Sequence, residues 1–173
     1  KSGISYNMVG GLKFYERKEI KDIIAYLREF FNPADSLSLL RIINVPKRGI
    51  GDASLAKIQA YAAANNVSLF EAVSNAAAID GLSSRFVSKL DDLAGIIFEL
   101  MNLANEAPVE DLIDRVLHDT GYLEELENER TPQAQSRIDN LHELISVAQE
   151  FAKSEEENNL ENFFGACCAG KRY

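Results

Sequence analysis

Cysteine is scarce in this sequence of 173 residues, and its two copies, Cys167 and Cys168, are adjacent near the end. Neighbouring cysteines are poorly placed to crosslink a fold, so we expect a reducing compartment, the cytoplasm. Long apolar runs are also missing, since none approaches the roughly 18 residues that span a bilayer. The polar stretch at Lys1 is not followed by the hydrophobic segment of a signal peptide. We therefore expect no membrane partner.

A third absence concerns periodicity. Beyond residue 12 the sequence has no sustained alternation of apolar and polar residues, no fixed-period repeat and no low-complexity tract. Apolar residues instead recur at helical spacing, which predicts an all-α fold of about eight helices. The exception is Ile4–Gly11, whose pattern is typical of a short strand ending in a glycine turn. Because a lone strand needs a partner, we expect it to pair outside this helical body, as in a fragment of a larger protein.

Caps and breakers predict where the helices begin and end. The length and the 46% hydrophobic content suit one domain with a sizeable core. Asn32–Pro33 ends one helix and Asp35 or Ser36 caps the next, while Ser68 and Glu71 form a capping box. Helices are predicted over 14–28, 39–43, 52–64 and 160–164, and also beginning at 68, 84, 108 and 132.

Charge is distributed unevenly along the chain. The net charge of −9 argues at first against a nucleic-acid partner. Residues 41–57, however, carry four basic and one acidic side chain, whereas residues 110–161 carry fifteen acidic and four basic ones. A basic segment on an acidic body suits a local contact with a nucleic-acid backbone. It suits equally a protein-binding surface of mixed sign.

The basic segment has a distinctive order of residue types. Within 45–58, a proline and two basic residues precede a Gly-Ile-Gly turn, and a helical pattern follows at once. We expect a helix, a tight glycine turn and a second helix that Asp52 or Ser54 caps. The free N–H groups and positive dipole end of that second helix would form an anion site. Nucleic-acid phosphate is the natural anion beside two basic side chains.

The predicted phosphate site combines backbone donors with side-chain charge. Its members are Lys47, Arg48, Gly49, Ile50, Gly51, Ser54 and Lys57. The N–H groups of residues 49–51 would bind phosphate oxygens, and the cations would supply charge. A second contact is predicted at Ser83, Arg85 and Lys89, after another glycine turn. The alternatives are a simple corner between helices at the first place and plain surface charge at the second.

Two other patterns carry less weight. Residues 165–171 fit the phosphate-loop spacing G-x-x-x-x-G-K, but Arg172 stands where Ser or Thr would hold magnesium, and no strand precedes them. We therefore expect no nucleotide site there. The adjacent cysteines lie far from His118 and His142 in the sequence, so we expect no metal site and no catalytic residue.

Several stretches resemble one protein family. The order of residue types in 45–58 resembles the helix-hairpin-helix motif, which holds duplex DNA by its backbone without reading bases. Other stretches resemble family positions at the same spacing. They are Tyr6–Gly11 with Phe14–Asp22, Asn32–Gly51, Thr120–Tyr122 and Gln135–Leu144. Over roughly residues 4–164, the chain resembles the UvrD/PcrA-type superfamily 1 DNA helicases, most closely the PcrA branch.

The resemblance implies a domain division and a role. Residues 1–12 would end the RecA-like 2A segment, 13–164 would form the helical 2B subdomain, and 165–173 would be a tail foreign to the family, such as a cloning remnant. The glycine turn would be the family's duplex-DNA contact, and the subdomain would swing to control unwinding. The parent would be an ATP-dependent 3'-5' DNA helicase of repair and replication, in the bacterial cytoplasm at the nucleoid.

The resemblance also implies what lies elsewhere. ATP and Mg²⁺ would bind in RecA-like domains outside this region, so we expect this chain alone to hold no cofactor, hydrolyse no ATP and unwind no DNA. Its partners would be the double-stranded DNA backbone, the remaining helicase domains and protein regulators. A second hypothesis is a protein-interaction or autoregulatory helical domain with no DNA binding of its own.

Overall fold

The computed structural model describes residues 13–154 and 163–164, and the structural statements below concern those residues. Within them the regular structure is helical, as the sequence predicts. The strand expected at 4–11 and the tail at 165–173 lie outside the described residues, as do the first three residues of the predicted 160–164 helix. Across the described ranges, no helix combines the length and the apolar character needed to cross a membrane.

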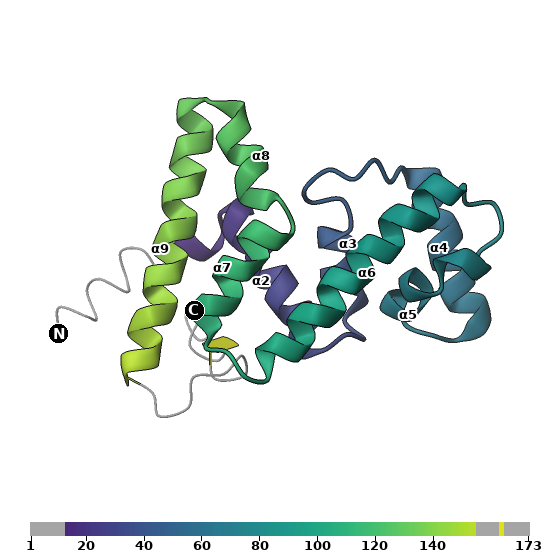
Figure 1. Ribbon diagram of the computed structural model, residues 1–173, viewed down its shortest axis with the longest axis horizontal. Coiled ribbons are helices and arrows are strands. Elements are labelled where there is room, and N and C mark those ends of the chain that lie inside the picture. Colours follow the sequence, from purple (N-terminus) through teal and green to yellow (C-terminus); the bar gives the residue numbers. More distant parts are fainter. Residues whose placement is uncertain (1–12, 155–162, 165–173) are drawn as a thin grey trace.

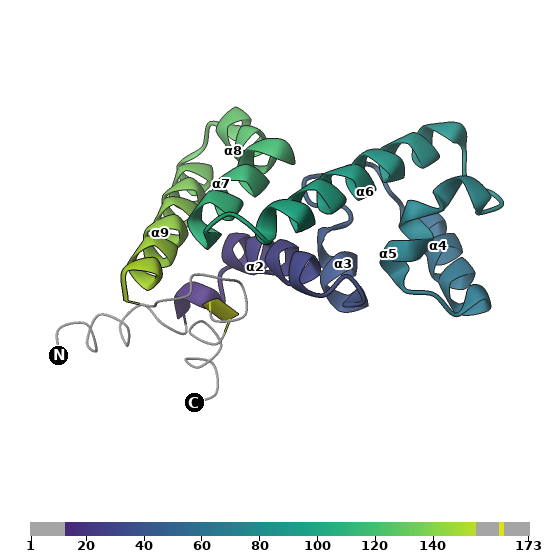
Figure 2. The same cartoon turned by 60° about the horizontal axis from the view of Figure 1, so that its bottom comes forward.

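The helices form two groups joined by one long helix (Figure 1). In chain order they are α2 (Lys18–Phe31), α3 (Ser36–Ile42), α4 (Asp52–Asn65), α5 (Leu69–Ser74), the 3-10 helix η1 (Ala76–Ala78), α6 (Ser84–Ala104), α7 (Val109–Asp119), α8 (Tyr122–Glu129) and α9 (Pro132–Ser154). α2 packs against α3, α6, α7 and α9, whereas α4 packs on α5 and α5 on α6. Figure 2 shows α6 running from the α7 end of the molecule to the α4–α5 end, above α2.

One apolar core continues through both groups. Helical spacing places one face of each long helix inward, so that Leu27 of α2, Ile97 of α6 and Leu141 of α9 are fully buried. At the other end, Ile58 of α4 and Val73 of α5 are fully buried as well. The short helices are therefore held by packing more than by intrinsic propensity.

The first described long helix differs slightly from its prediction. Residues 13–15 are helical, but the helix is interrupted at residues 16 and 17, where Arg17 has extended backbone angles (φ −68°, ψ 142°), so α2 begins at Lys18 rather than at Phe14. α2 also continues past Arg28 and ends at Phe31. Asn32 is extended (φ −143°, ψ 93°), because the following proline disfavours the helical conformation. The predicted breaker at Asn32–Pro33 is thus confirmed.

The predicted caps are mostly confirmed. The Asp35 carboxylate accepts a hydrogen bond from the Ser38 N–H at 3.1 Å, which leaves Ser36 inside α3. The Ser68 hydroxyl accepts from the Glu71 N–H at 3.1 Å, and the Ser83 hydroxyl caps α6 in the same way. These bonds satisfy first-turn N–H groups that have no partner within the helix.

A buried carboxylate ties three helices together. The Asp22 carboxylate is 1% exposed and accepts hydrogen bonds from Lys18 Nζ at 3.0 Å, Arg41 Nε at 2.9 Å and the Tyr122 hydroxyl at 2.8 Å. Burial and the negative charge of Asp22 raise the pKa of Tyr122, so the phenol stays protonated and donates. Next to Asp22, Glu19 accepts a hydrogen bond from Asn140 of α9 at 2.7 Å. α2 is thereby anchored to α3, α8 and α9.

Candidate nucleic-acid interface

The segment that joins α3 to α4, called here the connector, is residues 43–51. At nine residues it is longer than the tight turn expected from the sequence. It contains a cis peptide bond between Val45 and Pro46. Gly49 has a positive φ of 74°, a conformation that glycine adopts at little cost. Gly51 instead has φ −83° and forms the N-cap of α4.

The Asn44 side chain organises the connector. Its Oδ1 accepts hydrogen bonds from the N–H groups of Arg48 at 2.9 Å and Ile50 at 3.3 Å, and its Nδ2 donates to the Ile50 carbonyl at 2.8 Å. The Ile50 side chain is only 4% exposed. The Ile50 N–H, expected to be a free phosphate donor, is therefore already bonded. Sequence reasoning missed Asn44, although asparagine commonly bonds to nearby backbone in turns.

Arg48 holds the end of α3. Its Nη1 donates to the carbonyls of Ile42 at 2.7 Å, Ile43 at 3.1 Å and Val45 at 3.3 Å, and its Nη2 donates to the Tyr26 hydroxyl at 2.7 Å. The Tyr26 hydroxyl in turn donates to the Val45 carbonyl. A guanidinium with this set of partners is a structural clamp. The structure thus gives Arg48, expected to be a phosphate contact, an internal role.

The N-terminus of α4 presents unpaired donors. Among the described residues, the N–H groups of Gly49 and Gly51 have no hydrogen-bond partner, and no side chain caps α4. The expectation that Asp52 or Ser54 caps this helix is wrong; both residues lie in its first turn. First-turn N–H groups and the helix dipole favour an anion here, although the Asp52 carboxylate opposes one.

The two predicted contact regions form one surface. Lys57 Nζ donates to the Gly81 carbonyl at 2.9 Å, which fastens α4 to the turn before α6. Lys89 of α6 reaches the connector, since its Nζ would lie 3.0 Å from a methyl group placed on Gly49. Figure 1 shows the N-terminal ends of α4 and α6 at the same end of the molecule. Sequence alone left these two regions unconnected.

The most available cations lie on both sides of this junction. Lys47 on the connector and Arg85 in the first turn of α6 are exposed, and neither forms an ion pair within the described residues. α6 has no acidic residue in its first turn. The Ser83 hydroxyl is occupied as the α6 cap, and Ser54 is half-buried.

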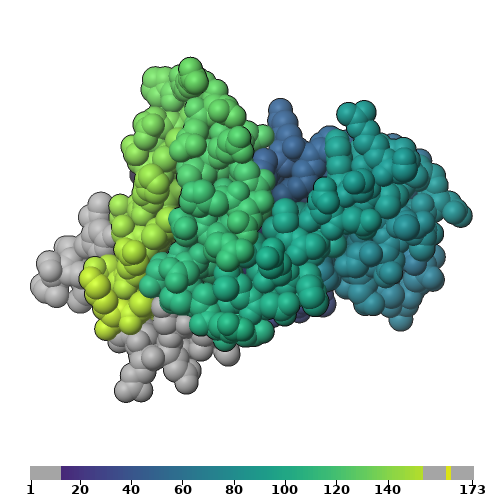
Figure 3. Space-filling view, in the orientation of Figure 1, coloured from purple at the N-terminus to yellow at the C-terminus, as the bar shows by residue number. Residues whose placement is uncertain are grey.

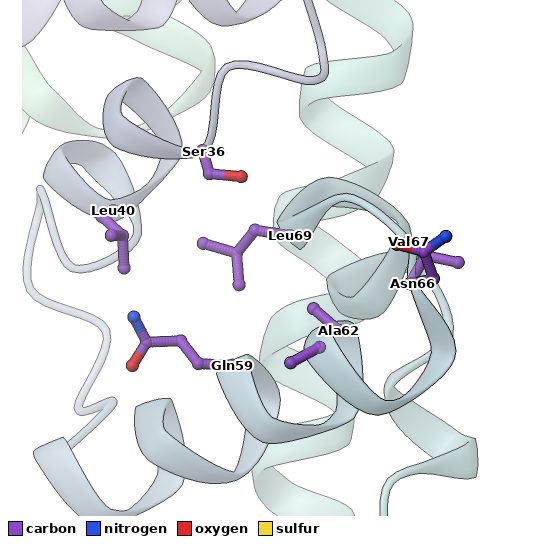
Figure 4. A pocket seen from close by; sticks show the side chains of 8 residues that line it. Ser36, Leu40, Gln59, Ala62, Asn66, Val67 and Leu69 are labelled. Atoms are coloured by element: carbon purple, nitrogen blue, oxygen red, sulfur yellow. The ribbon is translucent and has the colours of Figure 1, made fainter.

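Two grooves flank the connector region. The first, of about 300 Å³, separates α3 from α4 and α5; Leu40, Gln59 and Leu69 lie around it (Figure 4), and its lining carries no charged side chain. It therefore does not suit phosphate. The second, of about 290 Å³, lies between the connector and the start of α8. Its charged lining includes Lys47, Glu124 and Glu125.

Metal-ligating side chains do not gather in one place within the described ranges. Residues 13–154 and 163–164 contain no cluster of three or more His, Cys, Asp or Glu side chains able to hold a metal ion. His118 and His142 are exposed on α7 and α9, and Nδ1 of His118 lies 2.8 Å from the Asp114 carbonyl oxygen. The two cysteines and the 165–171 pattern lie outside the described residues.

The amino-acid sequence belongs to a known class of protein. The sequence model of the UvrD-like helicase C-terminal domain matches residues 1–167, and the chain therefore belongs to the UvrD-like helicase family. It is 44% identical over 163 residues to the ATP-dependent DNA helicase PcrA of Bacillus subtilis (strain 168). It is 43% identical over 165 residues to the proteins of the same name in Staphylococcus aureus (strain Mu50) and Staphylococcus epidermidis. Each match covers 94% of this chain but only 22% of the relative, so the chain spans about a fifth of their length.

Proposed function

We propose that this chain is the 2B subdomain of an ATP-dependent 3'-5' DNA helicase and that it binds duplex DNA through the connector and the start of α6. The observation that supports this role is the junction of the two regions, where Lys89 meets Gly49 and Lys57 meets Gly81. Unpaired N–H groups, two helix N-termini and the exposed Lys47 and Arg85 surround that junction. Such donors bind oxyanions, of which phosphate is the one that DNA presents.

The proposed contact holds the DNA backbone and reads no bases. Backbone N–H groups and lysines recognise phosphate oxygens, which are the same in every sequence. Since few phosphates are contacted, affinity should be weak, in the non-specific range of about 10⁻⁴–10⁻⁶ M, and should fall steeply with salt. Duplexes of equal length and different sequence should bind equally.

The remaining parts of the activity would lie in the rest of the helicase. ATP and Mg²⁺ would bind in the RecA-like domains, to which residues 1–12 would connect, and the described residues would contribute position and DNA contact. Repair or replication in the bacterial cytoplasm, at the nucleoid, is the setting that we propose for it; a bacterial relative is an ATP-dependent DNA helicase by name. The other helicase domains and protein regulators would be its partners.

Fluorescence anisotropy with a short blunt duplex tests the DNA contact. The Lys47→Ala/Arg85→Ala variant removes exposed charge and leaves the Arg48 clamp intact; Lys21→Ala/Lys153→Ala removes the same charge from exposed sites on α2 and α9. We expect the first variant to bind about tenfold or more weakly near 50 mM salt and to lower the slope of log K against log salt by about two. The control should bind like the wild type. Equal affinity for both variants would contradict the proposed contact.

The second candidate is an interaction domain without DNA binding. Leu37 of α3 is 80% exposed and Phe98 of α6 is 59% exposed, which is unusual for large apolar side chains. α8 also presents an exposed acidic face that includes Glu127 and Glu129. Absence of duplex binding at low salt by the folded wild type would favour this role.

A further inference from the structure

The second groove has walls of opposite charge. Glu124 and Glu125, named here the acidic edge, lie in the first turn of α8 and line the groove opposite Lys47. Glu125 Oε2 accepts a hydrogen bond from the Lys47 N–H at 3.4 Å, across 78 residues of sequence. In Figure 3 the surface of the connector lies between the green surface of α7 and α8 and the teal surface of α4 to α6.

We propose that the acidic edge sets one boundary of the DNA-binding surface and that Glu125 fixes the Lys47 backbone at that boundary. This inference rests on the proposed function. On one side, Gly49 of the connector meets Lys89 of α6, a helix with no acidic residue in its first turn, whereas Lys47 on the other side shares its groove with the acidic edge. Like charges repel at close range and are screened beyond about 10 Å at 0.1 M salt, so the acidic edge acts most on phosphates near Lys47, which lines the same groove.

The consequence is an oriented and weakened contact. A duplex that approaches from the α8 side meets two carboxylates before it reaches Lys47. A duplex that approaches from the α6 side meets Arg85, Lys89 and the free N-terminal donors first. The acidic edge therefore favours the second approach, and it lowers the overall affinity because its two carboxylates repel phosphates that reach Lys47.

Neutralising the acidic edge tests its effect on DNA binding. Glu124→Gln/Glu125→Gln should bind a blunt duplex about three- to fivefold more tightly than the wild type near 50 mM salt, and the gain should fade as salt rises. Glu127→Gln/Glu129→Gln makes the same charge change at exposed positions of α8 outside the groove. It should alter the affinity by less than about twofold. An equal gain in both variants would attribute the effect to net charge and overturn the proposed boundary.

A measurement without DNA separates this inference from the proposed function. At a fixed pH, Glu125→Gln should shift the amide resonance of Lys47, whereas Glu127→Gln, on the same helix but outside the groove, should leave it in place. A Lys47 amide that does not sense Glu125 would overturn the internal contact even if duplex binds. A Lys47 amide that does sense Glu125, in a chain that binds no duplex at low salt, would instead overturn the proposed function, and the boundary with it, while the contact itself would stand.

Discussion

The guanidinium of Arg48 lies against three carbonyl oxygens at the end of α3 and the hydroxyl of Tyr26. Because α3 ends at Ile42, its last carbonyls have no helical partners, and a planar fork of donors can satisfy several of them. Lys47, the neighbouring basic residue, is exposed instead. Two adjacent cations therefore differ in role: Arg48 positions the connector and Lys47 carries accessible charge.

The clamp predicts that charge alone cannot replace Arg48. Arg48→Lys should lower the free energy of unfolding by about 1–3 kcal/mol, since a single ammonium cannot bond to all four oxygens and leaves carbonyls unpaired. Urea unfolding followed by circular dichroism measures this change. Lys47→Ala, an exposed control, should stay within about 0.5 kcal/mol of the wild type. An Arg48→Lys variant with the same free energy of unfolding as the wild type would show that the clamp contributes nothing to stability.

At the scale of elements, the connector and α6 depend on each other. Gly49 adopts a left-handed backbone, and its missing side chain leaves room for Lys89 of α6. Gly81, with φ of 88°, similarly accommodates the Lys57 side chain. Close approach of a lysine to a glycine backbone is therefore used twice to join the connector, α4 and α6. The helices alone would not bring these charges together.

Two glycine substitutions should have opposite effects. Gly49→Ala forces a methyl group into a left-handed position 3.0 Å from Lys89 Nζ, and should cost about 1–2 kcal/mol of stability while weakening duplex binding. Gly95→Ala lies inside α6 with no atom within 4 Å of the added methyl group, and should stabilise by about 0.5–1 kcal/mol without changing binding. Thermal and urea unfolding compare the two variants directly. A Gly49→Ala variant as stable as Gly95→Ala would contradict the requirement for glycine at position 49.

At the scale of the whole molecule, one buried carboxylate makes stability depend on pH. Glu29 of α2 is fully buried, and its two carboxylate oxygens have no hydrogen-bond partner among the described residues. Burial, and next the negative charge of Asp35, raise the pKa of Glu29 from 4.5 to about 8. The folded chain therefore keeps a proton between these pH values that the unfolded chain releases. Protonated Glu29 therefore contributes stability that is fully present below the pKa of this carboxyl in the unfolded chain. That contribution is lost as the pH rises toward about 8.

Removing this carboxylate should flatten the pH profile. Glu29→Gln should be more stable than the wild type at pH 8, by about 2 kcal/mol or more, and nearly equal to it at pH 4.5. Urea midpoints at several pH values measure the difference. Glu106→Gln, an exposed control of equal charge change, should keep the wild-type slope. A Glu29→Gln variant that is less stable at pH 8 would show that the ionised carboxylate is satisfied in the fold.

The sequence by itself determined the helical class, the breaker at Asn32–Pro33, the cap at Ser68 and a cap at Asp35 or Ser36. These features are local, because a cap or a helical period depends on residues within one turn. The family was also visible in ordered stretches of the chain, and the match over residues 1–167 confirms it.

Only the tertiary structure decided which residues of the predicted site are available. It placed Arg48 against the end of α3, paired the Ile50 N–H with Asn44, and brought Lys89 to Gly49. The contacts of Lys89 with Gly49 and of Glu125 with Lys47 join positions 40 and 78 residues apart, respectively. The direction of a long side chain is set by such packing, which local sequence patterns do not contain.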